Sequence, residues 1–112
     1  MSSSVRLINH ASVKITVDDT SILSDPWYEG SVFHKGWKLI HEVPQNEYLK
    51  YLEKTDYIYV SHEHPDHFSP AFFLDKNIKS LIVKNNTKIL FQETKDKRVV
   101  NFLKKNGYEV IE

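Results

Sequence analysis

Hydrophobic and polar positions alternate near the start of this chain, which predicts β-strands. Residues 13–17 carry apolar side chains at every second position, the spacing of a strand with one buried and one solvated face. A shorter apolar run over 5–8 precedes them, separated by a turn or bulge at 9–10, and another run over 21–25 follows the polar pair 18–19. The polar pair predicts a hairpin turn, so the chain opens with a short strand followed by an antiparallel hairpin.

After residue 46, segments with helical spacing of apolar residues alternate with short apolar runs that are typical of strands. The predicted elements are a helix over 46–54, a strand over 56–60, a short helix over 70–75, a strand over 80–83, a helix over 96–105 and a strand over 108–112. Residues 87–92 fit either a helical turn or a loop. Because strands that alternate with helices pair in parallel, the sequence predicts an α/β fold in which an antiparallel start is extended by β-α units.

A long connection over residues 26–46 carries several aromatic side chains, among them Trp27 and Tyr28. Connections of this length are usually functional or disordered, and the aromatic content argues against disorder. Two interpretations remain open: the aromatic side chains border a functional cleft, or they cover an edge of the sheet.

The candidate chemistry is concentrated in the segment His62–His67, which reads HEHPDH and follows the predicted strand over 56–60. Ser69 and Pro70 then suit the N-cap and the first position of a helix. The segment is therefore a strand-to-helix loop at the carboxyl end of a strand, which is where open α/β sheets place their sites.

Metal binding follows from the spacing within this loop. His62 and His64 are two positions apart, so in an extended segment their rings project to the same side. The loop can offer these two nitrogens to one metal ion, and Asp66 with His67 to a second. Two ions about 3.5–4 Å apart can share a water and bring its pKa toward neutrality. Imidazole and carboxylate ligands suit Zn, Fe or Mn, and the chain has no Cys to supply a thiolate.

The pattern His-x-His-x-Asp-His after an apolar strand resembles the first metal motif of the metallo-β-lactamase superfamily, and Ser61–His67 matches it at every defined position. The segments 8–13 and 23–27 resemble the opening strands of one branch. That branch includes ascorbate-phosphate lactonase-like enzymes, N-acyl-phosphatidylethanolamine phospholipase D and the metallo-hydrolase-like part of CMP-N-acetylneuraminate hydroxylase. Residues 27–37 are most similar to the last of these. The resemblance covers residues 5–112.

The resemblance implies an αββα sandwich, of which residues 1–112 are the amino-terminal half. In the superfamily, two further His and an Asp from later in the chain complete the metal sites, whereas here no His follows His67. The only later Asp residues, Asp75 and Asp96, do not occupy the expected setting at a late strand end. We therefore expect a half-domain that needs a complementary half-domain or a missing carboxy-terminal segment to complete its site.

The resemblance also assigns roles within the loop. It makes His62, His64, Asp66 and His67 metal ligands. It further makes Asp66 the catalytic carboxylate, which receives a hydrogen bond or proton from the bridging hydroxide.

Two residues outside the loop are further candidates. In the related branch, a His at the place of His10 lies near the metal centre, where it contacts substrate or orients a ligand; considered alone, His10 would be a surface turn residue. Asp25 stands at a strand end before Pro26. It either accepts the ring N–H of a metal-bound His, or simply opens a turn.

Composition narrows the function without identifying it. Positive and negative charges balance at a formal net charge of zero, so nothing global favours nucleic acid or an acidic membrane. No apolar run is long enough for a membrane span and the first four residues lack a hydrophobic signal region. A cytoplasmic protein is the default expectation.

Together these features predict a metal-dependent hydrolase. Metal-activated hydroxide would attack an ester, lactone or phosphodiester of a small-molecule substrate, with two divalent ions, Zn first and Fe or Mn as alternatives. The hydroxylase of the resembling branch also uses a Rieske cluster with two Cys ligands, which this chain cannot supply. The alternative is a non-catalytic, truncated or split metal-binding half-domain.

Overall fold

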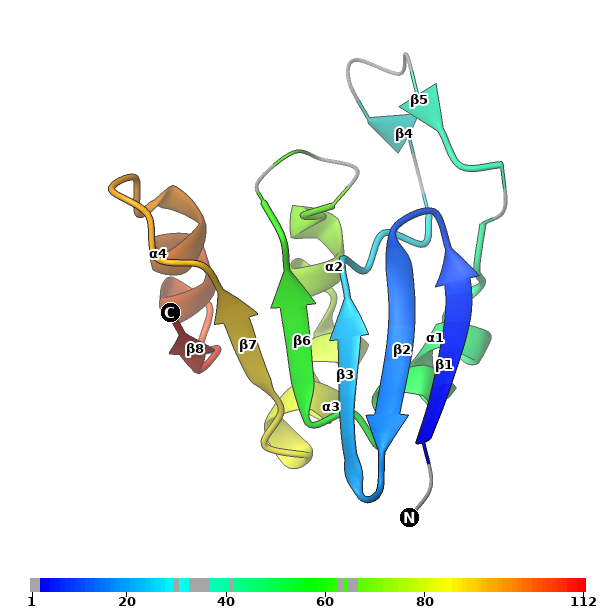
Figure 1. Cartoon of the computed structure of the whole chain (residues 1–112). Coiled ribbons are helices and arrows are strands. Elements are labelled where there is room, and N and C mark those ends of the chain that lie inside the picture. The colour runs from blue at the N-terminus through cyan, green and yellow to red at the C-terminus, as the bar shows by residue number, and fades with distance from the viewer. Residues whose placement is uncertain (1–2, 30, 33–36, 41, 63, 65–66) are drawn as a thin grey trace.

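A mixed sheet with helices on one face forms the body of the protein in this computed structural model (Figure 1), which describes residues 3–29, 31–32, 37–40, 42–62, 64 and 67–112. The sheet has the order β1-β2-β3-β6-β7-β8. Its strands are β1 (Ser3–Asn9), β2 (Ser12–Val17), β3 (Thr20–Ser24), β6 (Tyr57–Val60), β7 (Lys88–Phe91) and β8 (Val110–Ile111). The helices are α1 (Gln45–Leu52), α2 (Pro70–Leu74), α3 (Lys76–Lys84) and α4 (Arg98–Lys105). A separate hairpin pairs β4 (Ser31–Val32) with β5 (Trp37–Lys38).

The first three strands are antiparallel, which confirms the predicted hairpin. Asp18 turns the chain between β2 and β3 with a φ of 53°, a left-handed conformation that Asp tolerates better than most residues. The pairing of β1 with β2 shifts register between Leu7 and Asn9, so the expected irregularity at the end of the first strand is present.

The remaining strands pair in parallel, as the alternation of strands and helices predicts. Two predictions in this half are wrong. Residues 80–83 are helical and lie within α3, where Ile78 and Ile82, four positions apart, bury one helical face. The segment 87–92, expected to be a helical turn or loop, contains β7, whose Ile89 and Phe91 are buried at alternate positions. The last strand is shorter than the predicted 108–112.

Local capping explains where several helices begin and end. The Ser69 hydroxyl accepts the Phe72 N–H at the start of α2, and Pro70 occupies the first position, as expected. The Asp75 carboxylate caps α3 by accepting the N–H of Asn77 and of Ile78. Gly107, with a φ of 89°, follows the end of α4 and turns the chain toward β8. The Asp75 cap therefore starts a second helix directly after α2, at the place where the sequence predicts the end of a helix.

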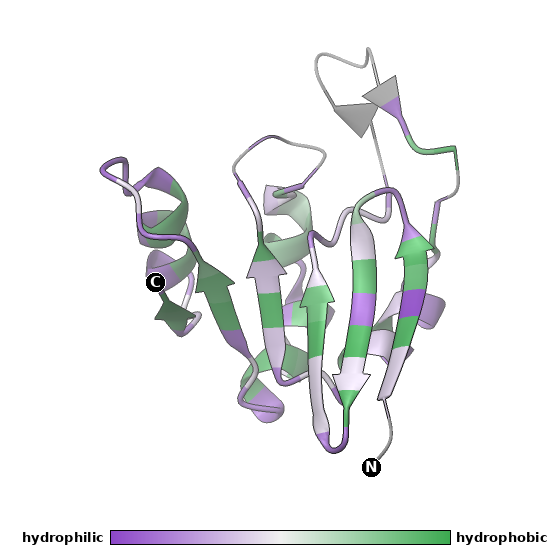
Figure 2. Ribbon diagram, viewed as in Figure 1, coloured by the Kyte–Doolittle hydropathy of each residue, from purple (hydrophilic) through white to green (hydrophobic). Residues whose placement is uncertain are grey.

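The core lies between the sheet and the helices. Leu23, Ile58 and Ile89 point from three neighbouring strands toward the helices, and each has no exposed surface. The helices contribute fully buried side chains opposite them, among them Phe73, Ile78 and Leu103. Burial of each such side chain contributes roughly 1.5–3 kcal/mol. Figure 2 shows that apolar positions recur along every strand of the sheet.

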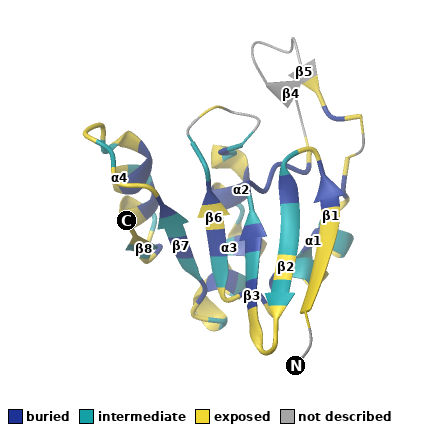
Figure 3. Cartoon of the chain, in the orientation of Figure 1, coloured by how far each residue is buried: buried dark blue, intermediate teal, exposed yellow. Residues whose placement is uncertain are grey.

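The opposite face of the sheet is also apolar, yet no described element covers it. Strand register places Val5 beside Ile15, Ile15 beside Ile22 and Ile22 beside Tyr57 on this face. A second row contains Leu7 with Val13, and Tyr59 with Leu90 and Ile111. Val5 is 72% and Leu7 69% exposed, and Figure 3 shows β1 exposed over most of its length. We call this surface, with its two rows, the open sheet face.

None of the described helices is long and apolar enough to cross a membrane.

Candidate metal centre

The carboxyl ends of four strands meet at one edge of the sheet, and the candidate residues follow them. β1 and β3 run in the same direction because both are antiparallel to β2, and β6 and β7 are parallel to β3. Their carboxyl ends lie at the upper edge of the sheet in Figure 1. His10 follows β1, Asp25 follows β3 and His62 lies just after β6. The topology thus collects side chains that are far apart in the sequence.

Asp25 is held in position by its backbone. Its N–H donates to the Tyr59 carbonyl at 2.8 Å, which extends the pairing of β3 with β6 past the end of β3. Its φ of 36° lies in the left-handed region, which is uncommon for a residue other than glycine. Only 5% of the residue is exposed. A buried carboxylate at a sharp bend needs hydrogen-bond donors, and the loop after β6 provides them.

Three donors converge on this carboxylate. The Ser61 N–H reaches Asp25 Oδ1 at 2.7 Å, and the Ser61 hydroxyl reaches Oδ2 at 2.7 Å. His67 Nδ1 lies 2.9 Å from Oδ2. Asp25 therefore ties both ends of the loop to the end of β3. Both sequence interpretations of Asp25 have a counterpart in the structure, since the residue bends the chain before Pro26 and also contacts a His of the loop.

Ser61 and Asp25 select the tautomers of the neighbouring neutral imidazoles. The Ser61 hydroxyl has one proton, which it donates to Asp25, so it can only accept from His62 Nδ1, 2.9 Å away. His67 Nδ1 must donate as well, because the Asp25 carboxylate only accepts. Both rings then carry their proton on Nδ1, which leaves the lone pair of each Nε2 available to a metal ion. Ser61 can influence the tautomer because its hydroxyl lies between the rings of His62 and His67.

The imidazoles of the loop lie against one another. The ring centroids of His62 and His67 are 4.0 Å apart, and those of His62 and His64 are 4.7 Å apart in an edge-to-face arrangement. His64 is exposed, whereas His62 and His67 are half-buried. The loop closes on itself as His64 accepts the N–H groups of His67 and Phe68 through its carbonyl. The structure therefore brings together three of the four predicted ligands.

Asp66, the fourth predicted ligand and the predicted catalytic carboxylate, lies outside the described residues. Within the described part of the chain, no group of three or more His, Asp or Glu side chains is arranged to hold a metal ion. The described residues thus offer two oriented imidazoles, His62 and His67, with His64 beside them.

His10 contacts the same cluster from the end of β1. Its ring packs edge-on against Trp27 with centroids 5.2 Å apart, and lies 5.9 Å from the ring of His67. The residue is exposed and has a φ of 42°. His10 is thus both a turn residue and a neighbour of the candidate metal ligands, which joins the two interpretations of the sequence.

The two aromatic residues that follow Pro26 pack in the protein interior next to the candidate site. Trp27 and Tyr28 are each 2% exposed, and Asn9 donates to the Trp27 carbonyl at 3.1 Å. The Tyr28 hydroxyl lies 2.7 Å from that of Ser12, and burial raises its pKa above the usual range. These two aromatics pack into the protein beneath the edge of the sheet. The other aromatic residues of the connection, Phe33 and Trp37, belong to a part whose side chains the structure does not describe.

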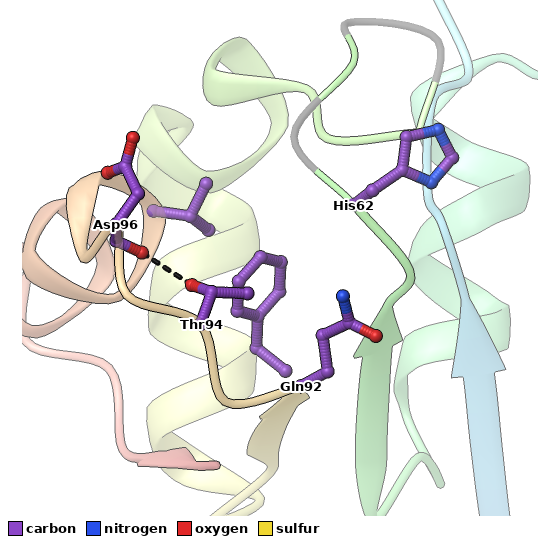
Figure 4. Close-up of a pocket in the computed structure, with 6 residues that line it drawn as sticks. His62, Gln92, Thr94 and Asp96 are labelled. Atoms are coloured by element: carbon purple, nitrogen blue, oxygen red, sulfur yellow. Dashed lines mark hydrogen bonds between the residues drawn. The ribbon is translucent and has the colours of Figure 1, made fainter.

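A pocket of about 190 Å³ lies beside His62 (Figure 4). Phe91 and Val99, only 7% and 6% exposed, supply its apolar part. Gln92, Thr94 and Asp96 supply its polar part from the segment that joins β7 to α4. The sequence analysis missed Gln92 as a site residue because residues 87–92 were not recognised as a strand. Recognition of that strand would have placed Gln92 at the same sheet edge as His62.

The sequence pattern of the family described as "Beta-lactamase superfamily domain" matches residues 4–109, nearly the whole chain. The chain belongs to the metallo-β-lactamase superfamily. It is 40% identical over 65 residues to cytidine monophosphate-N-acetylneuraminic acid hydroxylase of Cricetulus griseus, a stretch that covers 58% of this chain and 11% of that protein. The inactive human protein of the same name is 38% identical over 65 residues, 58% of this chain and 13% of that one. The chain thus spans only a small part of these relatives.

Several solved structures share this fold. The Igni18 metallo hydrolase of Ignicoccus hospitalis superposes with a TM-score of 0.63 at 19% identity, over 97% of this chain and 38% of that one. A possible metal-dependent hydrolase of Veillonella parvula gives a TM-score of 0.55 at 21% identity, over 96% and 40%. The CmlA β-hydroxylase gives 0.59 at 19% identity, over 98% and 21%. The predicted α/β half of a metallo-β-lactamase fold agrees with these proportions.

Proposed function

We propose that this chain carries the first metal motif of a metallo-β-lactamase hydrolase that cleaves an ester, lactone or phosphodiester of a small-molecule substrate. The observation that supports it best is the network of Asp25 and Ser61, which holds His62 and His67 with their Nδ1 atoms protonated. A surface histidine has no need of a buried carboxylate to select its tautomer, whereas a metal ligand does.

The donor set fits divalent metal ions. His62 and His64 would hold one ion, and Asp66 with His67 the second, with Zn as the first choice and Fe or Mn as alternatives. A bound metal supplies a Lewis acid that lowers the pKa of a coordinated water. The protein orients the rings through Asp25 and Ser61, and Asp66 is the residue proposed to hold or move the proton of the attacking water.

A complementary half is the second part of the proposal. Within the described residues no group of three His, Asp or Glu side chains is arranged to hold a metal ion, and a complementary half would supply further ligands. The open sheet face gives such a half a place to pack, because most side chains of its two rows are apolar and no described element lies above them. Packing of two sheets through such faces buries apolar surface on both.

A second candidate function is a non-catalytic metal-binding half-domain. It is favoured by the described residues, among which no group of three His, Asp or Glu side chains is arranged to hold a metal ion. The two functions share the same imidazoles and differ in whether a complementary half supplies the missing ligands.

The deciding experiment is elemental analysis of the purified, unchelated protein. We expect about one or more Zn, Fe or Mn per chain, and loss of that metal in His64→Ala. The control is His41→Ala, which removes a histidine outside the metal motif and should keep the metal. Asp66→Ala should remove the second-site metal and any hydrolysis of esters or phosphodiesters, with an unchanged circular dichroism spectrum.

A protein that binds no metal, even after incubation with each of the three ions, contradicts the non-catalytic metal-binding function. The hydrolase function would then stand only if a complementary half restores metal binding. Bound metal with no hydrolysis, also after addition of a complementary half, would favour the non-catalytic function. Unchanged metal content and turnover in Asp66→Ala would reject the assigned role of that carboxylate.

A further inference from the structure

The pocket beside His62 is a separate feature from the metal motif. It lies between the loop after β6 and the segment after β7, and among the described residues His62 belongs to both the motif and the pocket lining. Figure 4 shows Gln92 rising from the end of β7 between His62 and Thr94. A group bound here would therefore touch the imidazole side of the candidate metal centre.

The polar groups of the pocket differ in how far they are already engaged. The Thr94 hydroxyl donates to the Asp96 carbonyl, as the dashed line in Figure 4 marks. The Asp96 carboxylate accepts the Arg98 N–H at 2.9 Å and the Arg98 Nε–H at 2.7 Å. The Gln92 amide has no hydrogen bond to any described residue. Gln92 is thus the polar lining group that is available to a ligand.

Charge and size limit what the pocket can take. Among the described lining residues there is no Lys or Arg to pair with an anionic group, and the Asp96 carboxylate is already paired with Arg98. A volume of about 190 Å³ suits a small group. The amide of Gln92 can donate and accept at once, which matches a neutral amide or hydroxyl group. Phe91 and Val99 supply apolar contact for the carbon atoms of such a group.

We propose that this pocket is the substrate subsite next to the metal centre, that it takes a neutral amide- or hydroxyl-bearing group of the substrate, and that Gln92 selects that group. The proposal rests on the proposed hydrolase function and narrows its substrate class. The cleaved bond would lie on the His62 side, and a charged phosphate or carboxylate of the substrate would lie outside this pocket.

The test uses two probes of equal size, isobutyramide and isobutyrate, which differ in an amide against a carboxylate. Each is titrated into the 15N-labelled, metal-free chain, and binding is followed by amide chemical shifts. We expect isobutyramide to shift resonances of His62 and residues 91–99 and to bind at least about fivefold more tightly than isobutyrate, the value of one hydrogen bond. Gln92→Leu, which keeps the bulk and removes the amide, should weaken isobutyramide by a similar factor.

The neighbouring Glu93 does not line the pocket, so Glu93→Gln is the matched control and should bind isobutyramide like the parent. Equal binding of both probes, unchanged binding in Gln92→Leu, or shifts confined to another part of the chain would each overturn the proposal. The titration needs no metal, so a failure here is distinct from a failure to bind Zn, Fe or Mn. If isobutyramide binds and metal does not, the ligand class assigned to the pocket stands, whereas its assignment as a subsite next to a metal centre does not.

Discussion

His67 donates its Nδ1 proton to the Asp25 carboxylate across 2.9 Å, although the two residues are 42 positions apart in the sequence. The bond joins the end of β3 to the end of the loop after β6. It explains how the His67 imidazole is held in one orientation. The same carboxylate accepts from Ser61, so one buried group contacts both ends of the loop that carries the motif.

Asp25→Asn tests this relationship. The amide keeps the shape of the side chain but replaces one acceptor oxygen by an N–H donor. That donor then faces the donor group of either Ser61 or His67, so one hydrogen bond is lost. We expect Zn affinity to fall about 10–100-fold, the usual effect of removing the partner of a metal-bound His. Competition with a chelator of known affinity measures it. Asp19→Asn, in the exposed β2–β3 turn, is the control; an equal effect of both substitutions would mean that Asp25 has no special role.

Ser61→Ala should release the His62 ring. Without the hydroxyl, His62 Nδ1 loses its acceptor at 2.9 Å, and the ring is free to exchange tautomers. We expect 15N spectra of the metal-free protein to change from the Nδ1–H form to a mixture, together with weaker metal binding. Ser61→Thr keeps the hydroxyl and should restore both properties. A pure Nδ1–H spectrum in Ser61→Ala would refute the assignment.

The two faces of the sheet should respond differently to the same substitution. Leu23 has no exposed surface and faces the helices, so Leu23→Ala should lower the free energy of unfolding by about 2–5 kcal/mol. Leu7 is 69% exposed on the open sheet face, so Leu7→Ala should change it by less than about 0.5 kcal/mol. Urea unfolding at two protein concentrations measures both. A large, concentration-dependent cost at Leu7 would show that another copy of the chain covers this face.

Tyr108 should make stability sensitive to alkaline pH. Its hydroxyl donates to the buried Phe73 carbonyl, and burial raises its pKa from 10.0 to about 12. Because the unfolded chain loses this proton first, the free energy of unfolding should fall as pH rises from about 10 to 12. Tyr108→Phe should reduce this fall and cost about 1–2 kcal/mol at neutral pH through the lost hydrogen bond.

The control for Tyr108→Phe is Tyr59→Phe, which removes a hydroxyl from a residue that is 38% exposed. It should leave stability at neutral pH unchanged. A parent protein whose stability does not decline between pH 10 and 12 would contradict the effect assigned to Tyr108.

The two wrong element assignments, at residues 80–83 and 87–92, lie next to each other and have one cause. Residues 80–83 form a short apolar run that suits either a strand or a buried helix, and apolar spacing alone does not separate the two. The Asp75 cap and the spacing of Ile78 and Ile82 decide for a helix. Once α3 takes residues 76–84, the segment 88–91 becomes the next strand. The misassigned helix thus hid β7, and with it Gln92 at the edge of the site.

The sequence by itself determined the order of most elements, the antiparallel start, the parallel continuation and the loop that carries the metal motif. These features depend on local spacing, capping residues and turn residues, which act over a few positions. Superfamily membership was likewise present in the motif His62–His67 and its flanking segments.

Only the tertiary structure decided which residues contact the candidate metal ligands and hold them in position. Asp25 contacts Ser61 and His67, His10 contacts Trp27, and Gln92 lines the pocket beside His62. Each of these relationships joins strand ends that are distant in the sequence. Such contacts depend on strand order, since parallel pairing places the carboxyl ends of β3, β6 and β7 at one edge. Strand order also determines which apolar rows face the helices and which form the open sheet face, because pairing register aligns side chains across the sheet.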